Sequence, residues 1–520
     1  MKKKWIAGLV SVLLIVSAGL ISCQTASKYK WDADVVVVGG GLAGVSAALS
    51  AAQSGASVIL VEKQPALGGA SAQGGGGLGA TGSAVQKEYG IVDSPQAWLD
   101  MFYMRANQTK AAYRNKSFPV EADIKWLFDE SVLVIDWLLE QGMTFGKPFG
   151  IALDLTERYH SISNKGYSSG AGLVKFLSEK TEGLGVDTRV KTKAVKVIQE
   201  NGPGSRAVGI ELEDGSKIYA KTVILAAGGF MSDINKYIPG IDYVTFNKNL
   251  STFLFGEGIE MAVAAGGVLW EDPWASGVDP AQALTVGGLP QIARINQGMW
   301  VDSSGARIGF EGGNSGIQAN YPMFAQRDGG KLFAIITDKH ATPTQEQLNS
   351  GRVFKGNTLA ELAANAGINP AKLASEVVAY NAICDKIAVL NKSKAPDEAY
   401  KGVDPLDLEN ANTNPNKQPS PLPYNNTRKT YVKIDGPAFY AVELLPNICL
   451  TFGGVKTKTG TAEVLDKNDL TKVIPGLYAA GENANRNFYD KVYMSGSATM
   501  QAVATGRAAG RAAAAYAKAR

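Results

Sequence analysis

Cysteine and histidine are scarce in this sequence of 520 residues, which contains three cysteines and two histidines. It has no Cys-x-x-Cys-His motif for attaching a c-type haem, and its cysteines are too few and too scattered for an iron–sulfur cluster. Cys384 and Cys449 could pair, but two cysteines do not form a disulfide framework. His160 and His340 lie far apart, and no spacing of histidines or carboxylates indicates a metal site.

A strong excess of either charge is also lacking, since 52 basic residues face 48 acidic ones, for a formal net charge of +4. The first 22 residues contain three lysines and no acidic residue, so the charge of the remaining chain is +4 minus three, or +1. The slight basicity therefore comes from the N-terminal segment. This composition predicts no nucleic-acid partner.

The N-terminal segment has the pattern of an export signal. Lys2–Lys4 are followed by the apolar stretch Trp5–Ile21, and Leu20-Ile21-Ser22-Cys23 resembles a bacterial lipobox. We expect residues 1–22 to be a lipoprotein signal peptide and Cys23 to be lipidated, which would anchor the exported protein to the cell envelope. An uncleaved N-terminal anchor is the alternative, although the apolar stretch is marginal for spanning a bilayer. Gln24 after the cysteine favours the outer membrane or cell surface.

A dinucleotide-binding unit follows. Val35–Val38 is an apolar β-branched run typical of a buried parallel strand. The next residues have the spacing Gly-x-Gly-x-x-Gly and open a helix that is expected to end near Ser54. Gly39 permits the tight turn, Gly41 lets the backbone approach a pyrophosphate, and Gly44 allows the helix to pack closely on the strand.

The second strand, residues 58–61, ends at Glu62, whose carboxylate can accept hydrogen bonds from a ribose. A second glycine-rich stretch comes directly after it, from Gly68 to Gly77. An NAD domain does not need such a loop, whereas the pyrophosphate and ring system of a flavin pass along one. The sequence therefore predicts FAD as the cofactor.

Three further segments extend the pattern, at Val223–Phe230, Gly256–Ala262 and Ile474–Glu482. With them the chain resembles the FAD-dependent oxidoreductase 2 family, which includes the flavoproteins of fumarate reductase and succinate dehydrogenase. The likeness is greatest to the soluble exported flavocytochrome c type, here without a haem domain. It implies an α/β fold in which a discontinuous Rossmann-like FAD domain, residues 30–270 and 441–520, carries an inserted α+β capping domain, residues 271–440.

The resemblance also implies the cofactor contacts. The expected FAD-binding residues are Gly39, Gly41, Ala43, Gly44, Glu62, Lys63, Ala70, Ser71, Gly76, Gly77, Val195, Ala227, Gly228, Glu257, Gly481, Glu482, Ser497 and Ala498. Residues 495–500 would open the last helix and point N–H groups at the flavin, or would serve only as a helix cap. No histidine lies near Ala70–Gln73, so we expect the FAD to be bound non-covalently.

Two regular elements are predicted beyond these motifs. Residues 187–198 are expected to form one strand, which contains Val195. Residues 208–212 and 216–219 are expected to form a hairpin across Asp214-Gly215.

The substrate side departs from the family at each expected position. Leu450 stands where the family has a substrate-binding histidine, and Tyr493 stands where it has a substrate-binding arginine. Lys339 follows Asp338 at the place of the proton-donating arginine. Glu311 matches a proton-relay glutamate, but the arginine expected just beyond it is absent. These losses argue against a dicarboxylate substrate, unless Arg294, Arg327 or Arg352 compensates.

Tyr493 and Glu311 are the catalytic candidates. Related 3-ketosteroid dehydrogenases carry a tyrosine at a similar place in the flavin loop, and a phenol can act as a general acid or base. Tyr493 could equally pack beside the flavin, and Glu311 could be a solvated residue. The Arg158-Tyr159-His160 segment could bind substrate or be structural, and Lys339 with His340 is expected to form an exposed charged pair.

Three functions remain open. The leading hypothesis is an exported FAD enzyme that reduces an activated C=C bond of an unsaturated organic acid or enone other than fumarate, with electrons from a separate FMN-binding or cytochrome protein. The second is a dehydrogenase of 3-ketosteroid type that introduces a C=C bond. The third is a non-catalytic flavin-binding lipoprotein.

Overall fold

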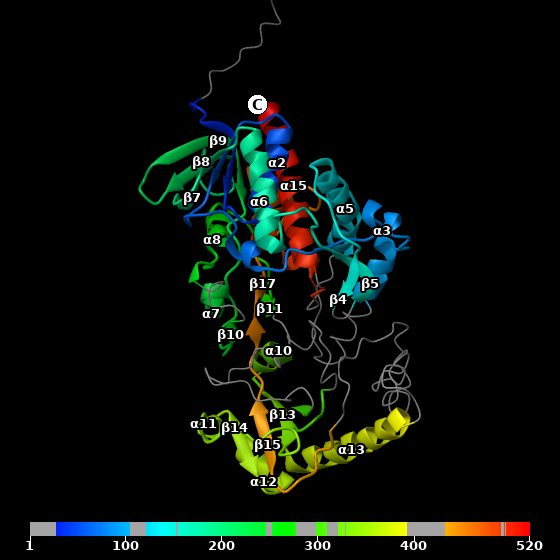
Figure 1. The fold of residues 1–520 in the computed structure, drawn as a ribbon. Coiled ribbons are helices and arrows are strands. Elements are labelled where there is room, and N and C mark those ends of the chain that lie inside the picture. Colours follow the sequence, from blue (N-terminus) through cyan, green and yellow to red (C-terminus); the bar gives the residue numbers. More distant parts are fainter. Residues whose placement is uncertain are drawn as a thin grey trace, which may run out of the picture.

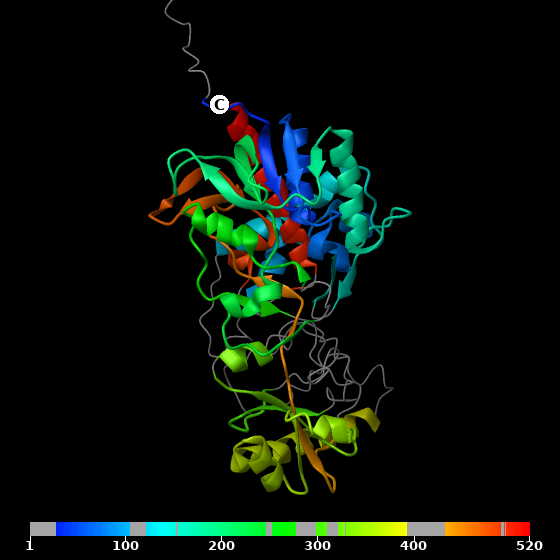
Figure 2. The ribbon, with the colours of Figure 1, turned by 90° about the vertical axis from the view of Figure 1, so that its left-hand side faces the viewer.

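The computed structural model describes residues 28–103, 121–151, 154–245, 252–276, 298–308, 321–327, 329–392, 432–489, 493–494 and 496–520. Cys23, Arg294 and Glu311 lie outside these ranges. Two modules are stacked along the long axis of the molecule, and the last part of the chain returns to the upper one (Figures 1 and 2). The upper module thus contains both ends of the described chain, which makes it discontinuous in sequence.

The upper module is built on a mixed sheet of eight strands. Six of them follow the order β18 (Glu463–Asp466), β19 (Asp469–Ala479), β9 (Lys217–Leu225), β1 (Ala33–Val38), β2 (Val58–Val61) and β6 (Asp187–Arg189). β7 (Ala194–Gln199) and β8 (Ala207–Leu212) extend from β9 as an antiparallel ribbon. β1 lies between β2 and β9, parallel to both, which confirms the central strand predicted from its valine run.

Alternate residues of β1 face opposite layers of the module, as the two-residue repeat of a strand requires. Val35 and Val37 pack with the alanines of α2 (Leu42–Gln53) and α15 (Ser497–Lys518). Val36 and Val38 pack with Met261 of α8 (Glu257–Ala264) and with β8. Both faces of the strand are therefore buried, which explains why its sequence is continuously apolar.

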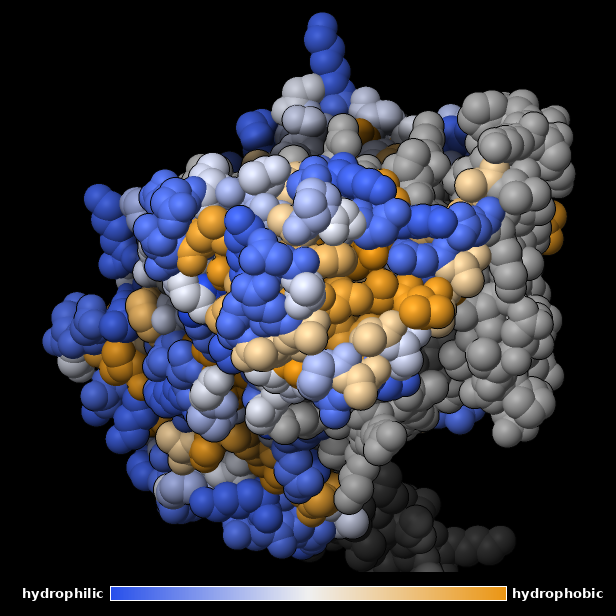
Figure 3. Space-filling model, turned by 90° about the horizontal axis from the view of Figure 1, so that it is seen from below, coloured by the Kyte–Doolittle hydropathy of each residue, from blue (hydrophilic) through white to orange (hydrophobic). Residues whose placement is uncertain are grey.

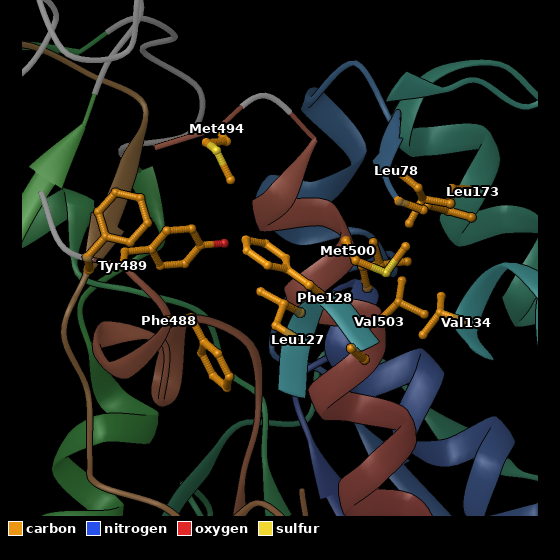
Figure 4. Packing of buried hydrophobic residues seen from close by; sticks show 14 of the residues in the cluster. Leu78, Leu127, Phe128, Val134, Leu173, Phe488, Tyr489, Met494, Met500 and Val503 are labelled. Atoms are coloured by element: carbon orange, nitrogen blue, oxygen red, sulfur yellow. The ribbon is translucent and has the colours of Figure 1, made fainter. Parts of the chain in front are cut away.

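α6 (Ser169–Gly183) and α5 (Glu121–Glu140) lie beside α2 and α15 on the same side of the sheet (Figure 1). Figure 4 shows Met500 and Val503 of α15 in one apolar layer with Leu127 and Phe128 of α5. The smaller elements of the upper module are η1 (Gly69–Gln73), β3 (Leu78–Gly79), α3 (Ala84–Glu88), β4 (Phe149–Ile151), β5 (Asp154–His160), η2 (Met231–Asp233), α7 (Ile234–Tyr237), η7 (Gly481–Asn483) and η8 (Arg486–Phe488).

The strand predicted at residues 187–198 is wrong as a single element. β6 and β7 are separate strands, because the backbone turns at Lys191, whose φ of 52° lies in the left-handed region. Val195 consequently lies on the outer ribbon and is 42% exposed. The predicted hairpin is confirmed, since β8 and β9 pair in antiparallel fashion with Gly209 opposite Tyr219.

The lower module is an antiparallel sheet covered by helices. Its strands follow the order β12 (Met299–Asp302), β13 (Leu332–Thr337), β15 (Phe439–Glu443) and β14 (Val353–Gly356). Its helices are α10 (Tyr321–Arg327), α11 (Gln345–Leu348), α12 (Leu359–Ala366) and α13 (Pro370–Lys392). Seen from below, its surface is mainly hydrophilic, with apolar residues gathered near the centre (Figure 3). The boundary expected at residue 440 falls inside β15.

Two short strand pairs lie between the modules (Figure 1). β10 (Val244–Thr245) runs parallel to β16 (Asn447–Ile448), and β11 (Trp274–Ser276) runs antiparallel to β17 (Leu450–Phe452). These pairs bring the segments that enter and leave the lower module side by side. Cys384 lies in the lower module and Cys449 between β16 and β17, and neither forms a disulfide. Within the described part of the chain, no helix has the length and apolarity needed to cross a membrane.

Candidate active site

A cavity of about 430 Å³ opens at the carboxyl ends of β1, β2, β9 and β19. Its walls include Gly39 after β1, Glu62 after β2, Ala226 after β9 and Gly481 after β19. Open α/β sheets bind their ligands at this edge, in the crevice outside the ends of the parallel strands. The volume lies within the range of roughly 300–1,000 Å³ that is usual for small-molecule sites.

Glu62 is fixed at one end of the cavity by two backbone hydrogen bonds. The N–H of Gly40 donates to Oε2 at 2.7 Å, and the N–H of Gln64 donates to Oε1 at 2.7 Å. The carboxylate thus ties the glycine turn to the end of β2 and still faces the cavity, where a ribose hydroxyl can reach it. Lys63 beside it forms an ion pair with Glu257 of α8 at 2.5 Å.

Four helices begin at this cavity. α2 starts after Gly41, α6 after Ser168, α8 after Gly256 and α15 after Gly496, and first-turn residues of all four helices line the walls. Helix N-termini carry unpaired N–H groups and a partial positive charge, so their convergence suits a ligand with a pyrophosphate and an electron-rich ring.

Gly44 shows how closely α2 packs on the glycine turn after β1. A Cβ atom at this position would lie 1.8 Å from the carbonyl oxygen of Gly39, so only glycine lets α2 approach the phosphate turn. The strand, turn, helix and acidic residue all meet the requirements for an FAD adenosine half. Glu62 would hold its ribose, and the N-termini of α2 and α15 would face its pyrophosphate and flavin.

Most of the predicted cofactor residues line the cavity. They are Gly39, Gly41, Ala43, Glu62, Lys63, Ala70, Ser71, Gly76, Gly77, Ala227, Gly228, Glu257, Gly481, Glu482 and Ala498. Three predicted residues do not line it. Gly44 packs behind the turn, Ser497 is buried with its hydroxyl donating to the carbonyl of Met494, and Val195 is exposed while its neighbour Ala194 faces the cavity.

Sequence reasoning missed several other wall residues. Thr192 and Lys193 reach the cavity because the chain turns between β6 and β7, and Gly170 reaches it at the start of α6. No local motif marks Thr192 or Lys193, since their place depends on the turn at Lys191. Gly170 lies two residues after Ser168, the N-cap residue of α6. Serine is a favoured N-cap residue, and this is the sequence signal that could have placed a helix start there.

Glu482 is a wall residue with an unusual ionisation. Burial raises its pKa to about 7, although the hydrogen bond from the hydroxyl of Thr451, 2.8 Å from Oε2, acts in the opposite direction. The group can therefore gain or lose a proton near neutral pH, in contact with the space that a cofactor would fill.

The far end of the cavity is aromatic and apolar. It is lined by Tyr159, Phe253, Cys449, Leu450 and Tyr493. The hydroxyl of Tyr159 accepts a hydrogen bond from the N–H of Gly77 at 3.2 Å, and a Cβ atom on Gly77 would lie 1.9 Å from the tyrosine ring. Gly77 thus makes room for an aromatic side chain from the segment that the sequence analysis left open as substrate-binding or structural.

Tyr493 lies between this wall and an aromatic cluster. Its ring centroid is 6.3 Å from that of Phe452 and 6.4 Å from that of Tyr489, and Phe452 is stacked on Trp274. Burial raises the pKa of the Tyr493 phenol above its ordinary value, and the neighbouring Cys449 and Tyr159 act in the same direction. The phenol therefore stays protonated at neutral pH.

None of the described residues that line the cavity is an arginine. Of the three arginines considered as replacements, Arg327 pairs with Asp272 and Arg352 pairs with Glu443 and Asp242. The third, Arg294, and the catalytic candidate Glu311 fall in segments that the structure does not describe.

The Arg158-Tyr159-His160 segment divides between the two expected roles. Tyr159 faces the cavity, whereas Arg158 forms a buried ion pair with Asp93 at 2.6 Å. His160 is fully buried and lies 2.8 Å from the hydroxyl of Ser83 and 2.7 Å from the carbonyl of Arg158. Arg158 and His160 are therefore structural residues.

The pair expected at Lys339 and His340 is half correct. Lys339 is exposed and pairs with Asp435 at 2.7 Å. His340 is buried instead, because its ring folds back on the end of β13, where its Nδ1 accepts a hydrogen bond from the N–H of Thr337 at 3.1 Å.

Comparison with known proteins agrees with this geometry. The family model described as FAD binding domain matches residues 34–500. A fumarate reductase (cytochrome) of Shewanella frigidimarina is 29% identical over 506 residues, covering 93% of this chain and 77% of the relative. A urocanate reductase of Eggerthella lenta is 27% identical over 474 residues, covering 87% of this chain and 70% of the relative. The crystal structure of 3-ketosteroid-delta4-(5alpha)-dehydrogenase from Rhodococcus jostii RHA1 has a TM-score of 0.63 at 24% identity and covers 95% of this chain and 99% of its own.

Proposed function

The chain belongs to the FAD binding domain family, and from this premise we propose that it reduces an activated C=C bond of an unsaturated organic acid or enone other than fumarate. It is a flavoprotein oxidoreductase that acts on CH–CH or C=C groups. Relatives named fumarate reductase and urocanate reductase take unsaturated acids as substrates, as their names state. The proposal keeps their type of reaction and changes the substrate.

The composition of the far end of the cavity carries the proposal. Leu450, Cys449, Tyr159 and Tyr493 occupy it, and none of them carries a positive charge at neutral pH. A charge-assisted hydrogen bond to a carboxylate contributes roughly 1.5–3 kcal/mol. A dicarboxylate would therefore lose much of its binding energy here, whereas an apolar conjugated substrate loses nothing.

Tyr493 is placed to supply the proton that the reduction needs. FAD, when bound and reduced, would supply the hydride for one carbon of the alkene. The other carbon then needs a proton, and the Tyr493 phenol, held protonated by burial, can donate it and be reprotonated from solvent. The product is a saturated CH–CH unit, with both electrons coming from the flavin.

A dehydrogenase of 3-ketosteroid type is the second candidate, and the tyrosine in the flavin loop is the observation that favours it. In that direction Tyr493 would have to accept a proton. Its raised pKa makes the phenolate scarce at neutral pH, so kinetics measured in both directions decide between the two candidates.

The test is anaerobic kinetics with a panel of unsaturated acids and enones. We expect reduced enzyme to be reoxidised by some members of the panel, and Tyr493→Phe to slow this step at least 100-fold. Tyr167→Phe is the matched control, because that phenol lies on the surface and bonds to Glu179. If only oxidation of saturated substrates with an oxidising dye is seen, the reductase proposal fails.

We further propose that the enzyme is exported, anchored through Cys23 and reduced by a separate FMN-binding or cytochrome protein. The lipobox-like sequence at residues 20–23 motivates the anchor, and the relative named for its cytochrome motivates the electron donor. Metabolic labelling with a fatty acid should mark the wild-type chain and not Cys23→Ala. Unlabelled wild-type protein would rule out the anchor.

A further inference from the structure

We propose that Ser276 and Asn447 form a polar pair that binds an uncharged hydrogen-bonding group of the substrate, a carbonyl or a hydroxyl. The inference rests on the proposed function and names the substrate class that this site takes: a neutral conjugated ketone or a hydroxyl-bearing aryl alkene. Both residues belong to the two short strand pairs between the modules. They are neighbours of the residues that line the far end of the cavity.

Ser276 lies behind the Leu450 wall and is not itself a lining residue of the cavity, and the register of its strand sets the direction of its side chain. It lies directly opposite Leu450 in the antiparallel pair of β11 with β17, and its carbonyl accepts a hydrogen bond from the N–H of Cys449 at 2.9 Å. Residues directly opposite each other in such a pair project their side chains to the same face. Because Leu450 lines the cavity, the Ser276 hydroxyl projects to the same side as that wall.

The Ser276 side chain is in an unusual state for a buried polar group. The residue is 1% exposed, and its hydroxyl finds no hydrogen-bond partner in the described structure. Burying such a group unpaired costs about 1–3 kcal/mol. A ligand that supplied the missing partner would recover that cost on binding.

Asn447 is in the same state a short distance away. It is 1% exposed, and neither its amide nitrogen nor its amide oxygen has a partner within the described part of the chain. It precedes the wall residue Cys449 by two positions, so the two Cα atoms are at most about 7 Å apart. One hydroxyl and one primary amide are therefore left unpaired beside the same stretch of wall.

The chemistry of the two groups defines their ligand. A serine hydroxyl and an asparagine amide both donate and accept hydrogen bonds, and neither carries charge. They match a carbonyl or a hydroxyl group. A carboxylate prefers charge-assisted bonds, which are about twice as strong as neutral ones.

The surrounding aromatic residues suit a planar substrate. Trp274 precedes Ser276 by two residues in β11, and its ring stacks on Phe452 with centroids 4.1 Å apart. Tyr489 packs against Phe452 with centroids 4.5 Å apart. Flat conjugated molecules pack well against such surfaces.

The experiment uses the FAD-loaded full chain and two matched pairs of ligands. The first pair is 4-phenyl-3-buten-2-one and cinnamate, which differ in a ketone against a carboxylate. The second is 4-vinylphenol and styrene, which differ in one hydroxyl. Dissociation constants come from the perturbation of the flavin absorbance by each ligand, and KM and kcat come from anaerobic turnover.

We expect Ser276→Ala and Asn447→Leu each to weaken binding of the ketone and the phenol about tenfold, which corresponds to about 1.4 kcal/mol. Cinnamate, styrene and kcat should change little. Ser46→Ala is the control, because that hydroxyl is also buried and without a partner among the described residues but lies on α2. It should change none of these constants.

Two outcomes overturn the pair. One is an equal effect of the substitutions on both members of each ligand pair. The other is unchanged dissociation constants with lowered thermal stability, which would mean that the two groups hold only a buried water. If wild-type enzyme binds the ketone but turns over no alkene, the proposed function fails, and the binding constants still decide the role of Ser276 and Asn447.

Discussion

Replacement of Glu482 by glutamine in the FAD-free protein tests whether the cofactor cavity shifts the ionisation of this carboxyl to near neutral pH. Burial raises its pKa from an ordinary value of 4.5 to about 7. The folded chain therefore binds this proton more tightly than the unfolded chain does. Stability contributed by the protonated form is present below about pH 4.5 and is lost as the pH rises toward 7.

The magnitude follows from the two pKa values. A difference of about 2.5 units at 1.36 kcal/mol per unit is at most about 3 kcal/mol between pH 4.5 and pH 7. Partial exposure of the side chain reduces this figure. Glutamine cannot ionise, so the variant should become more stable than the wild-type protein as the pH rises, with the difference levelling off above pH 7.

The assay is urea unfolding of both proteins between pH 4.5 and pH 8, followed by tryptophan fluorescence. The difference between the two free energies of unfolding isolates Glu482 from other groups, including Asp123, whose pKa burial also raises. Glu346→Gln is the control, because that residue is exposed at the start of α11. Parallel stability curves for Glu482→Gln and wild-type protein would refute the reasoning.

Three further predictions concern other parts of the molecule. Gly44→Ala should abolish FAD binding, measured by flavin content after desalting, because its Cβ atom would lie 1.8 Å from the Gly39 carbonyl oxygen; normal flavin content would contradict the packing of α2 on its turn. Asp93→Asn should lower the free energy of unfolding by about 3–5 kcal/mol, because it leaves the buried Arg158 charge without its partner; a loss below 1 kcal/mol would show that water reaches the pair. Acid denaturation should release the yellow colour into the supernatant, and colour retained in the pellet would indicate a covalent flavin.

The cofactor half of the fold could be predicted because its signals are local. The valine run of β1, the glycine turn and Glu62 occur within 30 residues, and the structure confirms each as an element or a wall of the cavity. The strand expected at residues 187–198 failed because its apolar pattern continues through a turn. That turn depends on the left-handed backbone of Lys191, a residue type that gives no such signal.

The substrate half could be predicted only as a set of departures. Leu450 and Tyr493 were identified from their places in family motifs, but their surroundings depend on pairings between distant segments. Ser276 lies opposite Leu450 because β11 pairs with β17, although the two residues are 174 positions apart in the sequence. Tyr159 packs against Gly77 only because β5 pairs with β3. No local sequence pattern predicts either contact.

This difference in origin bears on how such an enzyme acquires a new substrate. The βαβ part of the cofactor site comes from one continuous unit, Val35 to Glu62, in which Gly44 cannot change without disturbing the packing of α2 on its turn. The far wall includes single side chains on β5, β17 and the loop before α15, and the two strands are held by backbone pairing that does not depend on the identity of those side chains. Leucine and tyrosine can therefore stand at positions 450 and 493, where the family pattern has cationic side chains, without disturbing the fold. Under the proposed function, the same FAD frame would serve a neutral substrate, and its selectivity would be set by the residues that line this end of the cavity.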